Sequence, residues 1–367
     1  MSKGQLPRWV DFGLLPALNL IAAFIVSGLV VVIIGEDPFE AVKWLVWGAL
    51  GYGEGIGYTL YYATNFIFTG LAVAVAFHAG LFNIGGEGQA YVGGLGIALA
   101  CLALDRFIPW WVTFPFAIAG GALFGAAWAF IPAYLQAKRG SHIVITTIMF
   151  NFIASALMVY LLSNILIPQG SMSPSSRNFE AGGQLPLLRN VFTSFDFGQS
   201  PVNLAFFLAL AVCVVVWLLI WHTKLGYEIR SFGKNPDAAA YAGISPVRIT
   251  IITMLISGAL AGLMGINVVM GEQTRLLLDF AGGAGFVGIA VALMGRGHPV
   301  GIILASMLFG LLYQGGAELA FEIPTISRDM IVVIQALVIL FAGALEHMFR
   351  PAVVAFFNRF SSDTAEA

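Results

Sequence analysis

The sequence contains few charged residues. Only 10% of its 367 residues are Asp, Glu, Lys or Arg, whereas 59% are hydrophobic; an average soluble domain carries about 25% charged residues. So few charges cannot cover a globule of this length with a hydrated surface, which excludes a soluble enzyme, a disordered chain and a coiled coil. The formal net charge of −2 also lacks the basic surface that nucleic-acid binding requires, so we expect no nucleic-acid partner.

Reactive and metal-ligating side chains are scarce as well. The two cysteines, Cys101 and Cys213, lie in separate apolar runs, and the five histidines are scattered singly, so neither type supports a disulfide framework or a metal site. Gly233-Lys234 is followed by Asn235, with no earlier glycine at phosphate-loop spacing, which predicts that the chain has no ATPase site of its own. Because no catalytic set appears in one span either, we expect no enzyme activity and no cofactor.

Long apolar runs dominate the rest of the chain. About 20 apolar residues cross a bilayer as an α-helix, and ten segments meet or approach this length without Lys, Arg, Asp or Glu in their interiors. The ten predicted spans are 12–34, 57–77, 87–104, 110–135, 142–165, 201–221, 249–269, 280–294, 299–317 and 330–349. The sequence therefore predicts an all-α, polytopic membrane protein with about ten transmembrane helices, forming a single membrane domain over residues 1–367.

Lys and Arg are enriched on the cytoplasmic side of membrane proteins. If the N-terminus is cytoplasmic, most of the 17 Lys and Arg residues fall on that side, and an even number of spans returns the C-terminus there. This orientation places the loop 222–248 and the tail 350–367 inside. It places outside the loop 166–200, which either docks an external protein or is passive. It also places outside a short interfacial helix at 37–48, for which Asp37 is the expected N-cap.

Glycines gather at equivalent places in the two sets of five spans. Such sets have opposite orientations, which is the inverted-repeat organisation of many transporters. One group lies between spans two and three, and the other between spans seven and eight. The two groups are Gly80, Gly85, Gly86 and Gly88, and Gly271, Gly282, Gly283 and Gly285. Broken helices at matching positions indicate a transport pathway, although glycine can simply permit tight packing, as we expect for Gly121, Gly125, Gly258 and Gly262.

Polar residues within the predicted spans have two interpretations. Thr147, Asn151 and Ser155 recur every four residues and therefore form one stripe on a helix. Asn267 lies in a later span. Each side chain can bond a neighbouring helix, which is the more common role. The stripe is the better candidate for lining a wet cavity, because three aligned polar groups share one face.

The loop 222–248 is predicted to contain a short helix. Asn235 is a good N-cap, Pro236 suits the first helical position, and Asp237 lies near the positive end of the helix dipole. Gly243 suits the left-handed position that ends a helix. A short helix between two spans at the cytoplasmic face can transmit force from a soluble partner, or it can be an ordinary surface turn.

Several stretches resemble one family of membrane proteins. The residues Gly226 to Pro236, with Ala238-Ala239 and Gly243-Ile244, are similar to a loop of the ribose and branched-chain amino acid permeases of ABC importers. The run Asn83-Ile84-Gly85-Gly86-Glu87-Gly88-Gln89 resembles the nucleoside-type branch of that superfamily. So do Thr147 to Asn151, Gly288 to Leu293, and His298-Pro299. The Leu-Pro pair that ends the usual Glu-Ala-Ala element of importer permeases is missing here.

This resemblance implies a type II-like fold and a set of partners. Two ten-helix permeases, which are often different chains in the nucleoside branch, would surround one pathway. Cytoplasmic ABC ATPases would dock on the coupling helices, and an external or periplasmic substrate-binding protein would deliver the small-molecule solute. The chain would then be a lipid-embedded permease of a bacterial cytoplasmic membrane, with both termini inside. Its favoured solute would be a nucleoside.

The predicted site residues fall into two sets. For the substrate pathway we expect Asn83, Glu87, Gln89, Asn151 and Asn267. For coupling to the ATPase we expect Arg230, Gly233, Asn235, Pro236, Asp237, Ala238, Ala239 and Gly243. Alternatives stay open: a simple sugar, a purine base or a branched-chain amino acid as solute, a secondary transporter driven by protons or sodium, or a membrane-embedded enzyme.

Overall fold

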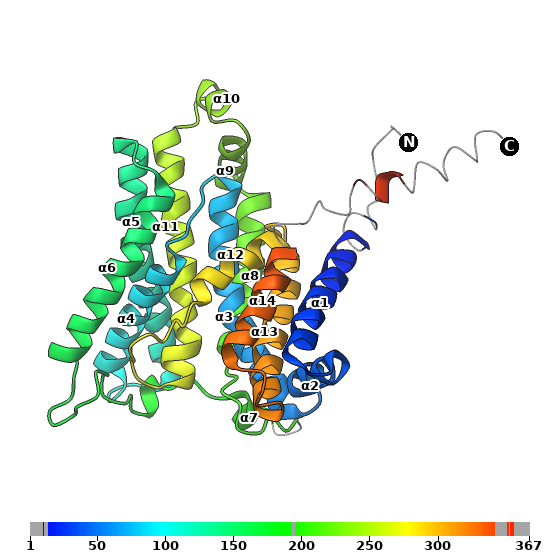
Figure 1. The fold of residues 1–367 in the computed structure, drawn as a ribbon. Helices are drawn as coiled ribbons and strands as arrows, with labels where there is room; N and C mark the ends of the chain where they lie inside the picture. Colours follow the sequence, from blue (N-terminus) through cyan, green and yellow to red (C-terminus); the bar gives the residue numbers. More distant parts are fainter. Residues whose placement is uncertain (1–9, 11–13, 193–194, 342–350, 352, 356–367) are drawn as a thin grey trace, which may run out of the picture. The chain divides into compact units, whose positions relative to one another are not determined.

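A computed structural model describes residues 10, 14–192, 195–341, 351 and 353–355 (Figure 1). In these residues the chain is helical apart from its loops and two isolated antiparallel β-bridges, Ser175 with Leu277 and Leu187 with Asn203. The first helices are α1 (Leu15–Ile34), α2 (Pro38–Leu50), α3 (Gly53–His78), α4 (Gly86–Leu104), α5 (Trp110–Arg139) and α6 (Ile143–Asn164). The loop 166–200, which the sequence predicts to lie outside and which we call the outer loop, has a 3₁₀ turn η2 (Ala181–Gly183) and α7 (Leu188–Val191).

The second part of the chain begins with α8 (Ala205–His222), α9 (Lys224–Lys234) and α10 (Pro236–Tyr241). These are followed by α11 (Pro246–Gly265), the π-helical segment η3 (Ile266–Glu272), α12 (Ala284–Met294), α13 (Pro299–Glu322) and α14 (Arg328–Ile339). Eight of the described helices are long and apolar enough to cross a membrane, and α12 and residues 329–338 of α14 form two shorter apolar helices. The prediction of an all-α, multi-pass membrane protein is confirmed.

The chain divides into two compact units. One contains Met1–Ala49 with Leu312–Ala367, and the other contains Leu50–Leu311. In the first unit, Val31 of α1, Ala41 of α2 and Leu319 of α13 belong to one buried apolar cluster. α2 confirms the helix predicted at 37–48: Oδ1 of Asp37 accepts a 2.8 Å hydrogen bond from the Phe39 N–H. The predicted tail 350–367 lies almost entirely outside the described residues.

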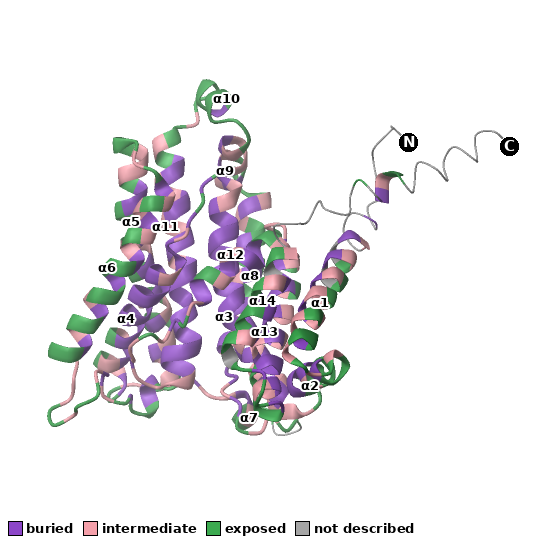
Figure 2. Cartoon of the chain, in the orientation of Figure 1, coloured by how far each residue is buried: buried purple, intermediate pink, exposed green. Residues whose placement is uncertain are grey.

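The second unit is built around α3, α4 and α11. The most apolar stretch of α3 is 83% buried, and that of α11 with η3 is 72% buried, whereas that of α5 is only 22% buried (Figure 2). α3 and α11 therefore form the centre of the unit, and α5 lies at its periphery. α3 packs on α12, whereas α4 packs on α11. This crossed pairing agrees with two related halves, because the helix before each chain break contacts the helix after the other break.

Glycine allows the backbones of α4, α5 and α11 to touch. A Cβ atom on Gly262 of α11 would lie 2.2 Å from the carbonyl oxygen of Gly121 in α5, and one on Gly125 would lie 2.2 Å from that of Gly258. At the same residue, a Cβ on Gly93 of α4 would lie 2.3 Å from the Gly262 Cα. The predicted packing role of these α5 and α11 glycines is confirmed. Such contacts suit lipid, where association depends on close packing.

Two predicted spans differ from the observed helices. The predicted span at 280–294, which the glycine cluster interrupts, is helical from Ala284 as α12, because Gly282 and Gly283 have φ values of 54° and 83°. Eleven residues at about 1.5 Å each cover roughly half of the hydrocarbon thickness, so α12 is a half-helix. In the span 330–349 the helix is described to Ile339, and residues 342–349 lie outside the described part of the chain.

The two ends of the second unit carry different structures. α9 and α10 lie at one end, and the outer loop with α7 lies at the opposite end (Figure 1). The predicted helix in 222–248 is confirmed as α10. Asn235 Oδ1 accepts a 3.0 Å bond from the Ala238 N–H, and Gly243 has a φ of 81° just after the helix. α9 was not predicted, and it is capped by Thr223, whose hydroxyl accepts from the Gly226 N–H.

The glycine contact predicts a large effect of one substitution. Gly262→Val should lower the free energy of unfolding by about 1–3 kcal/mol, because the added side chain meets backbone that cannot move aside. Leu123→Val on α5 is the control, since Leu123 is 68% exposed. Thermal unfolding of the purified protein in detergent, followed by circular dichroism, measures both. Equal midpoints for the two variants would contradict the packing role.

Candidate functional site

The first break in the transmembrane helices lies between α3 and α4, at residues 79–85. Asn83 folds it into a turn: its Oδ1 accepts a 2.9 Å bond from the Gly85 N–H, and its Nδ2 donates to Gln89 Oε1 at 2.8 Å and to Ser257 Oγ at 2.8 Å. Ser257 in turn donates to the Ala72 carbonyl at 2.6 Å. Backbone that leaves a helix in a membrane must find partners within the protein, and Asn83 supplies them here.

Asn151 of α6 also provides hydrogen-bond partners for backbone groups of the first break. Its Oδ1 accepts from the Gly88 N–H at 2.9 Å, and its Nδ2 donates to the Ile84 carbonyl at 3.0 Å. Both backbone groups lie at the start of α4, where helical partners are missing. Asn151 thus fixes α6 against the N-terminal turn of α4.

The second break lies between η3 and α12, at residues 273–283. Thr274 and Asp279 have φ values of 48° and 55°, which non-glycine residues adopt only when the surroundings hold them there. The Asp279 N–H donates to the hydroxyl of Tyr91 in α4. This segment returns the chain from the end of η3 to the half-helix α12.

The two breaks meet at Glu87. Its carboxylate oxygens accept bonds from the Gly283 N–H at 2.8 Å and the Gly285 N–H at 2.7 Å, at the N-terminus of α12. A helix N-terminus favours an anion because its first N–H groups lack helical partners. The backbones also touch, since a Cβ on Gly285 would lie 2.2 Å from the Glu87 nitrogen. The N-terminus of α4 and the N-terminus of the half-helix α12 therefore meet across one carboxylate, and helix N-termini of broken helices form the sites of many transporters.

A cavity of about 270 Å³ opens beside this junction, between α4, α6, α12 and the second break. Its lining combines two carboxylates, an amide, a hydroxyl and several aromatic rings, with no Lys, Arg or His among the described lining residues. The lining residues are Glu87, Gly88, Tyr91, Ile148, Asn151, Phe152, Ser155, Asp279, Gly283 and Phe286. An apolar cavity with a few convergent polar groups is the usual form of a small-molecule site. Within the described residues, no group of three or more His, Cys, Asp or Glu side chains is placed to hold a metal ion.

The predicted pathway residues occupy three different places. Glu87 and Asn151 line the cavity. Asn83 and Gln89 are buried behind it and bond each other, so they support the first break. Asn267 lies in another network, described next. Of the predicted polar stripe, Asn151 and Ser155 face the cavity, while Thr147 is fully buried and donates to the Ile143 carbonyl.

Asn267 joins three segments within the bundle. It lies in η3 and donates to Asn65 Oδ1 of α3 at 2.8 Å and to the Tyr61 carbonyl at 3.0 Å. It accepts at 2.9 Å from Nδ2 of Asn203, which precedes α8. Tyr61 also donates its hydroxyl proton to Glu272 at the end of η3. These bonds hold the π-helical segment against its neighbours. Asn267 therefore links helices to one another.

Sequence reasoning missed five members of the cavity lining: Tyr91, Ile148, Phe152, Asp279 and Phe286. Only Asp279 has a local signal, a charged residue just before the glycine cluster at 282–285. The aromatic residues cannot be told from lipid-facing ones in a chain with 30 phenylalanines. Their role depends on tertiary arrangement.

α9, which carries predicted coupling residues, contacts the first break directly. A Cβ on Gly233 of α9 would lie 2.2 Å from the His78 carbonyl oxygen at the end of α3, and 2.9 Å from the Gly80 nitrogen. Arg230 Nε donates to the Ile220 carbonyl at 3.1 Å and fixes α9 to α8. α10 follows α9 without an intervening loop and is mostly exposed, with Ala239 as its buried residue.

The role of Asn151 predicts a stability difference. Asn151→Leu should lower the free energy of unfolding by about 2–4 kcal/mol, because the Gly88 N–H and the Ile84 carbonyl each lose a buried partner at about 1–3 kcal/mol. Ser155→Ala is the control, since Ser155 shares the stripe but is exposed. Thermal unfolding in detergent compares them. An Asn151→Leu protein as stable as the control would show that these backbone groups have other partners.

Comparison with known proteins agrees with this geometry. Residues 55–343 match the family model described as branched-chain amino acid transport system / permease component. A glucose ABC transporter permease protein of Haloferax volcanii is 34% identical over 98% of this chain and 94% of its own length. A guanosine ABC transporter permease protein of Bacillus subtilis is 34% identical over 90% and 93%, and a nucleoside ABC transporter permease protein of Lactococcus lactis is 32% identical over 89% and 90%. The chain therefore belongs to the permease family of branched-chain amino acid transport systems.

Proposed function

We propose that this protein is the permease subunit of an ATP-driven ABC importer and that the cavity at Glu87 lies on its route for a small polar solute. The observation that carries the proposal is the meeting of the N-termini of α4 and the half-helix α12 at Glu87, beside a cavity. Ionisable residues within a membrane are costly and usually serve function, and broken helices of this kind bind substrates in other transporters. Asn83, Gln89 and Asn151 support the first break, which helps to shape this cavity.

A nucleoside fits the cavity chemistry best. Phe152, Phe286 and Tyr91 offer aromatic faces on which a base can stack. Glu87 and Asp279 offer oxygen acceptors for ribose hydroxyls, and Asn151 offers an amide beside them. Two of the relatives are nucleoside and guanosine permease proteins, which supports the same solute class here. The glucose permease relative favours a simple sugar as the second candidate.

The energy and the solute would come from partners. We infer that ABC ATPases dock on α10 and that an external or periplasmic substrate-binding protein delivers the solute. Lactococcus lactis and Bacillus subtilis each have a second, less similar nucleoside or guanosine permease protein, 30% and 29% identical to this chain. This supports a pair of two different permeases. The proposed location is a bacterial cytoplasmic membrane with both termini inside.

Reconstitution tests the proposal. The chain, its partner permease and its ATPases are incorporated into liposomes with the binding protein outside, and uptake of labelled nucleosides and glucose is measured with ATP enclosed. ATP-dependent nucleoside uptake is expected, with glucose at background. Uptake without ATPase subunits would instead indicate a secondary transporter, and chemical conversion of the solute would indicate a membrane-embedded enzyme.

The charge at the start of α10 predicts a graded loss of coupling. Asp237 lies in the first turn of this helix, where a negative side chain is favourable by about 0.3–1 kcal/mol. Asp237→Arg should therefore lower solute-stimulated ATPase activity about threefold, and Asp237→Asn should lower it less. Activity is measured in the reconstituted complex at equal subunit content. Wild-type stimulation in both variants would argue against α10 as the docking helix.

A further inference from the structure

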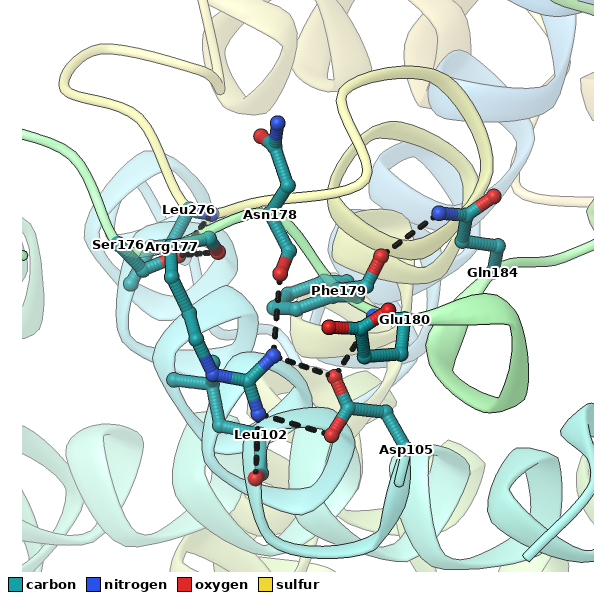
Figure 3. A network of polar contacts seen from close by, with 9 residues as sticks. All are labelled: Leu102, Asp105, Ser176, Arg177, Asn178, Phe179, Glu180, Gln184 and Leu276. Atoms are coloured by element: carbon teal, nitrogen blue, oxygen red, sulfur yellow. Dashed lines mark hydrogen bonds and ion pairs between the residues drawn. The ribbon is translucent and has the colours of Figure 1, made fainter.

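An ion pair fastens the outer loop to the end of α4. Arg177 forms two parallel bonds with Asp105, from Nη1 to Oδ2 at 2.7 Å and from Nη2 to Oδ1 at 2.8 Å (Figure 3). Nη2 also donates to the Leu102 carbonyl at 3.0 Å. The Asp105 side chain is fully buried. A two-pronged, charge-assisted contact of this kind fixes both position and orientation.

Backbone contacts extend this attachment along the loop. The Glu180 N–H donates to Asp105 Oδ2 at 2.8 Å. A Cβ on Gly182 would lie 2.2 Å from the Ile108 carbonyl oxygen, and one on Gly183 would lie 2.9 Å from the Asp105 Cβ. The loop is thus pressed against the end of α4 over several residues. We call residues 175–185 the outer strap.

The Asp105 carboxylate remains charged in ordinary buffers. Burial raises its pKa, but the hydrogen bonds from Arg177 and the Glu180 N–H, with the charges of Arg177 and Arg106, outweigh burial and hold the pKa below its usual range. A group with a lowered folded-state pKa stabilises the fold above its unfolded value and loses that contribution only as pH falls through the folded value. The ion pair is therefore intact at neutral pH.

The other face of the outer strap is bound to the second break. The Ser176 N–H donates to the Leu276 carbonyl at 3.0 Å, the Leu276 N–H donates to Ser176 Oγ at 2.9 Å, and the Phe179 N–H donates to the Thr274 carbonyl at 2.7 Å. Phe179 and Leu276 are buried in one apolar cluster. The outer strap therefore bridges α4 and residues 274–277.

The same second break forms a wall of the cavity. Asp279 and Gly283 line the cavity only a few residues beyond the strap contacts. The left-handed conformations of Thr274 and Asp279 need external support. On one side this support comes from Tyr91, and on the other from the outer strap.

We propose that Asp105 and Arg177 are positioning residues for transport, which hold the outer strap so that it sets the position of the cavity wall at Asp279 and Gly283. The inference rests on the proposed import function. It assigns to the outer loop a role inside the pathway, in addition to any contact with an external protein. Neither residue touches the solute; both act through residues 274–277.

Variants of the Asp105–Arg177 ion pair, which we call the clasp, test this inference in the full reconstituted importer. Arg177→Met should slow ATP-dependent uptake about tenfold, the size of effect that a lost charged hydrogen-bond pair commonly produces. Because Arg177→Met leaves a buried charge, Asp105→Asn with Arg177→Met is made as well. Gly182→Ala displaces the strap through the carbonyl oxygens of Ile108 and Asp105, which its Cβ would meet, and keeps both side chains of the ion pair. All three should slow uptake at unchanged subunit content.

Arg189→Met is the matched control. Arg189 lies in the same outer loop, but it donates to Gln199 Oε1 at 2.7 Å and to the Gly198 carbonyl, both within that loop. It loses the same charge without releasing the second break. Its uptake rate should stay within about twofold of wild type, the range of an ordinary surface change.

A cross-link separates positioning from general stability. Ser175 and Leu277 form an antiparallel bridge, and opposed residues in such pairs have Cα atoms about 4.5–5.5 Å apart, which suits a disulfide. With both replaced by Cys in the Arg177→Met chain, oxidation should restore uptake to within about twofold of wild type, and a reductant should abolish the gain. The natural Cys101 and Cys213 are buried and remain unchanged.

The outcomes are distinct. Slower uptake in the clasp and Gly182 variants, normal uptake in Arg189→Met, and reversible rescue by the cross-link would support the inference. Wild-type uptake in correctly assembled clasp variants, an equal loss in Arg189→Met, or oxidation without rescue would overturn it. Absence of ATP-dependent uptake by the wild-type importer would instead overturn the proposed function, so the two failures are distinguishable.

Discussion

The architecture depends on satisfying backbone that leaves its helix within the membrane. At the first break this is done by two amides, Asn83 and Asn151, with Gln89 bonding the Asn83 side chain, and at the second by the Glu87 carboxylate. Each polar group in lipid lacks water as a substitute partner, so every one of these bonds is needed. The breaks place the ends of α4 and α12 beside a cavity, and the side chains that repair them determine its shape.

The cavity is connected by direct contact to both ends of its unit. Toward α9, Gly233 touches the backbone of the first break; toward the outer loop, residues 274–277 pair with the strap. Both connections run through backbone in close contact. A movement of α9 or of the outer loop would therefore displace the two helix ends beside Glu87 directly, because no long chain of flexible side chains lies between them.

Local features of this fold were predictable from sequence, whereas distant pairings were not. Asn235 caps the start of α10 through a bond to Ala238, and Gly243 follows its end in a left-handed conformation. The apolar runs set the positions of the spans. The partners of Glu87 are 196 and 198 residues away, and those of Asp105 are 72 and 75. No periodicity encodes such separations. Asn267 shows the same limit, because a polar residue in a span looks alike whether it lines a cavity or links helices.

The cavity lining has one further consequence. Glu87 and Asp279 place two acidic side chains, and no basic one, among the described residues that line the cavity, and such groups disfavour an anion where water is scarce. In an importer, a solute that gains a phosphate group after entry would meet this repulsion on any attempt to leave.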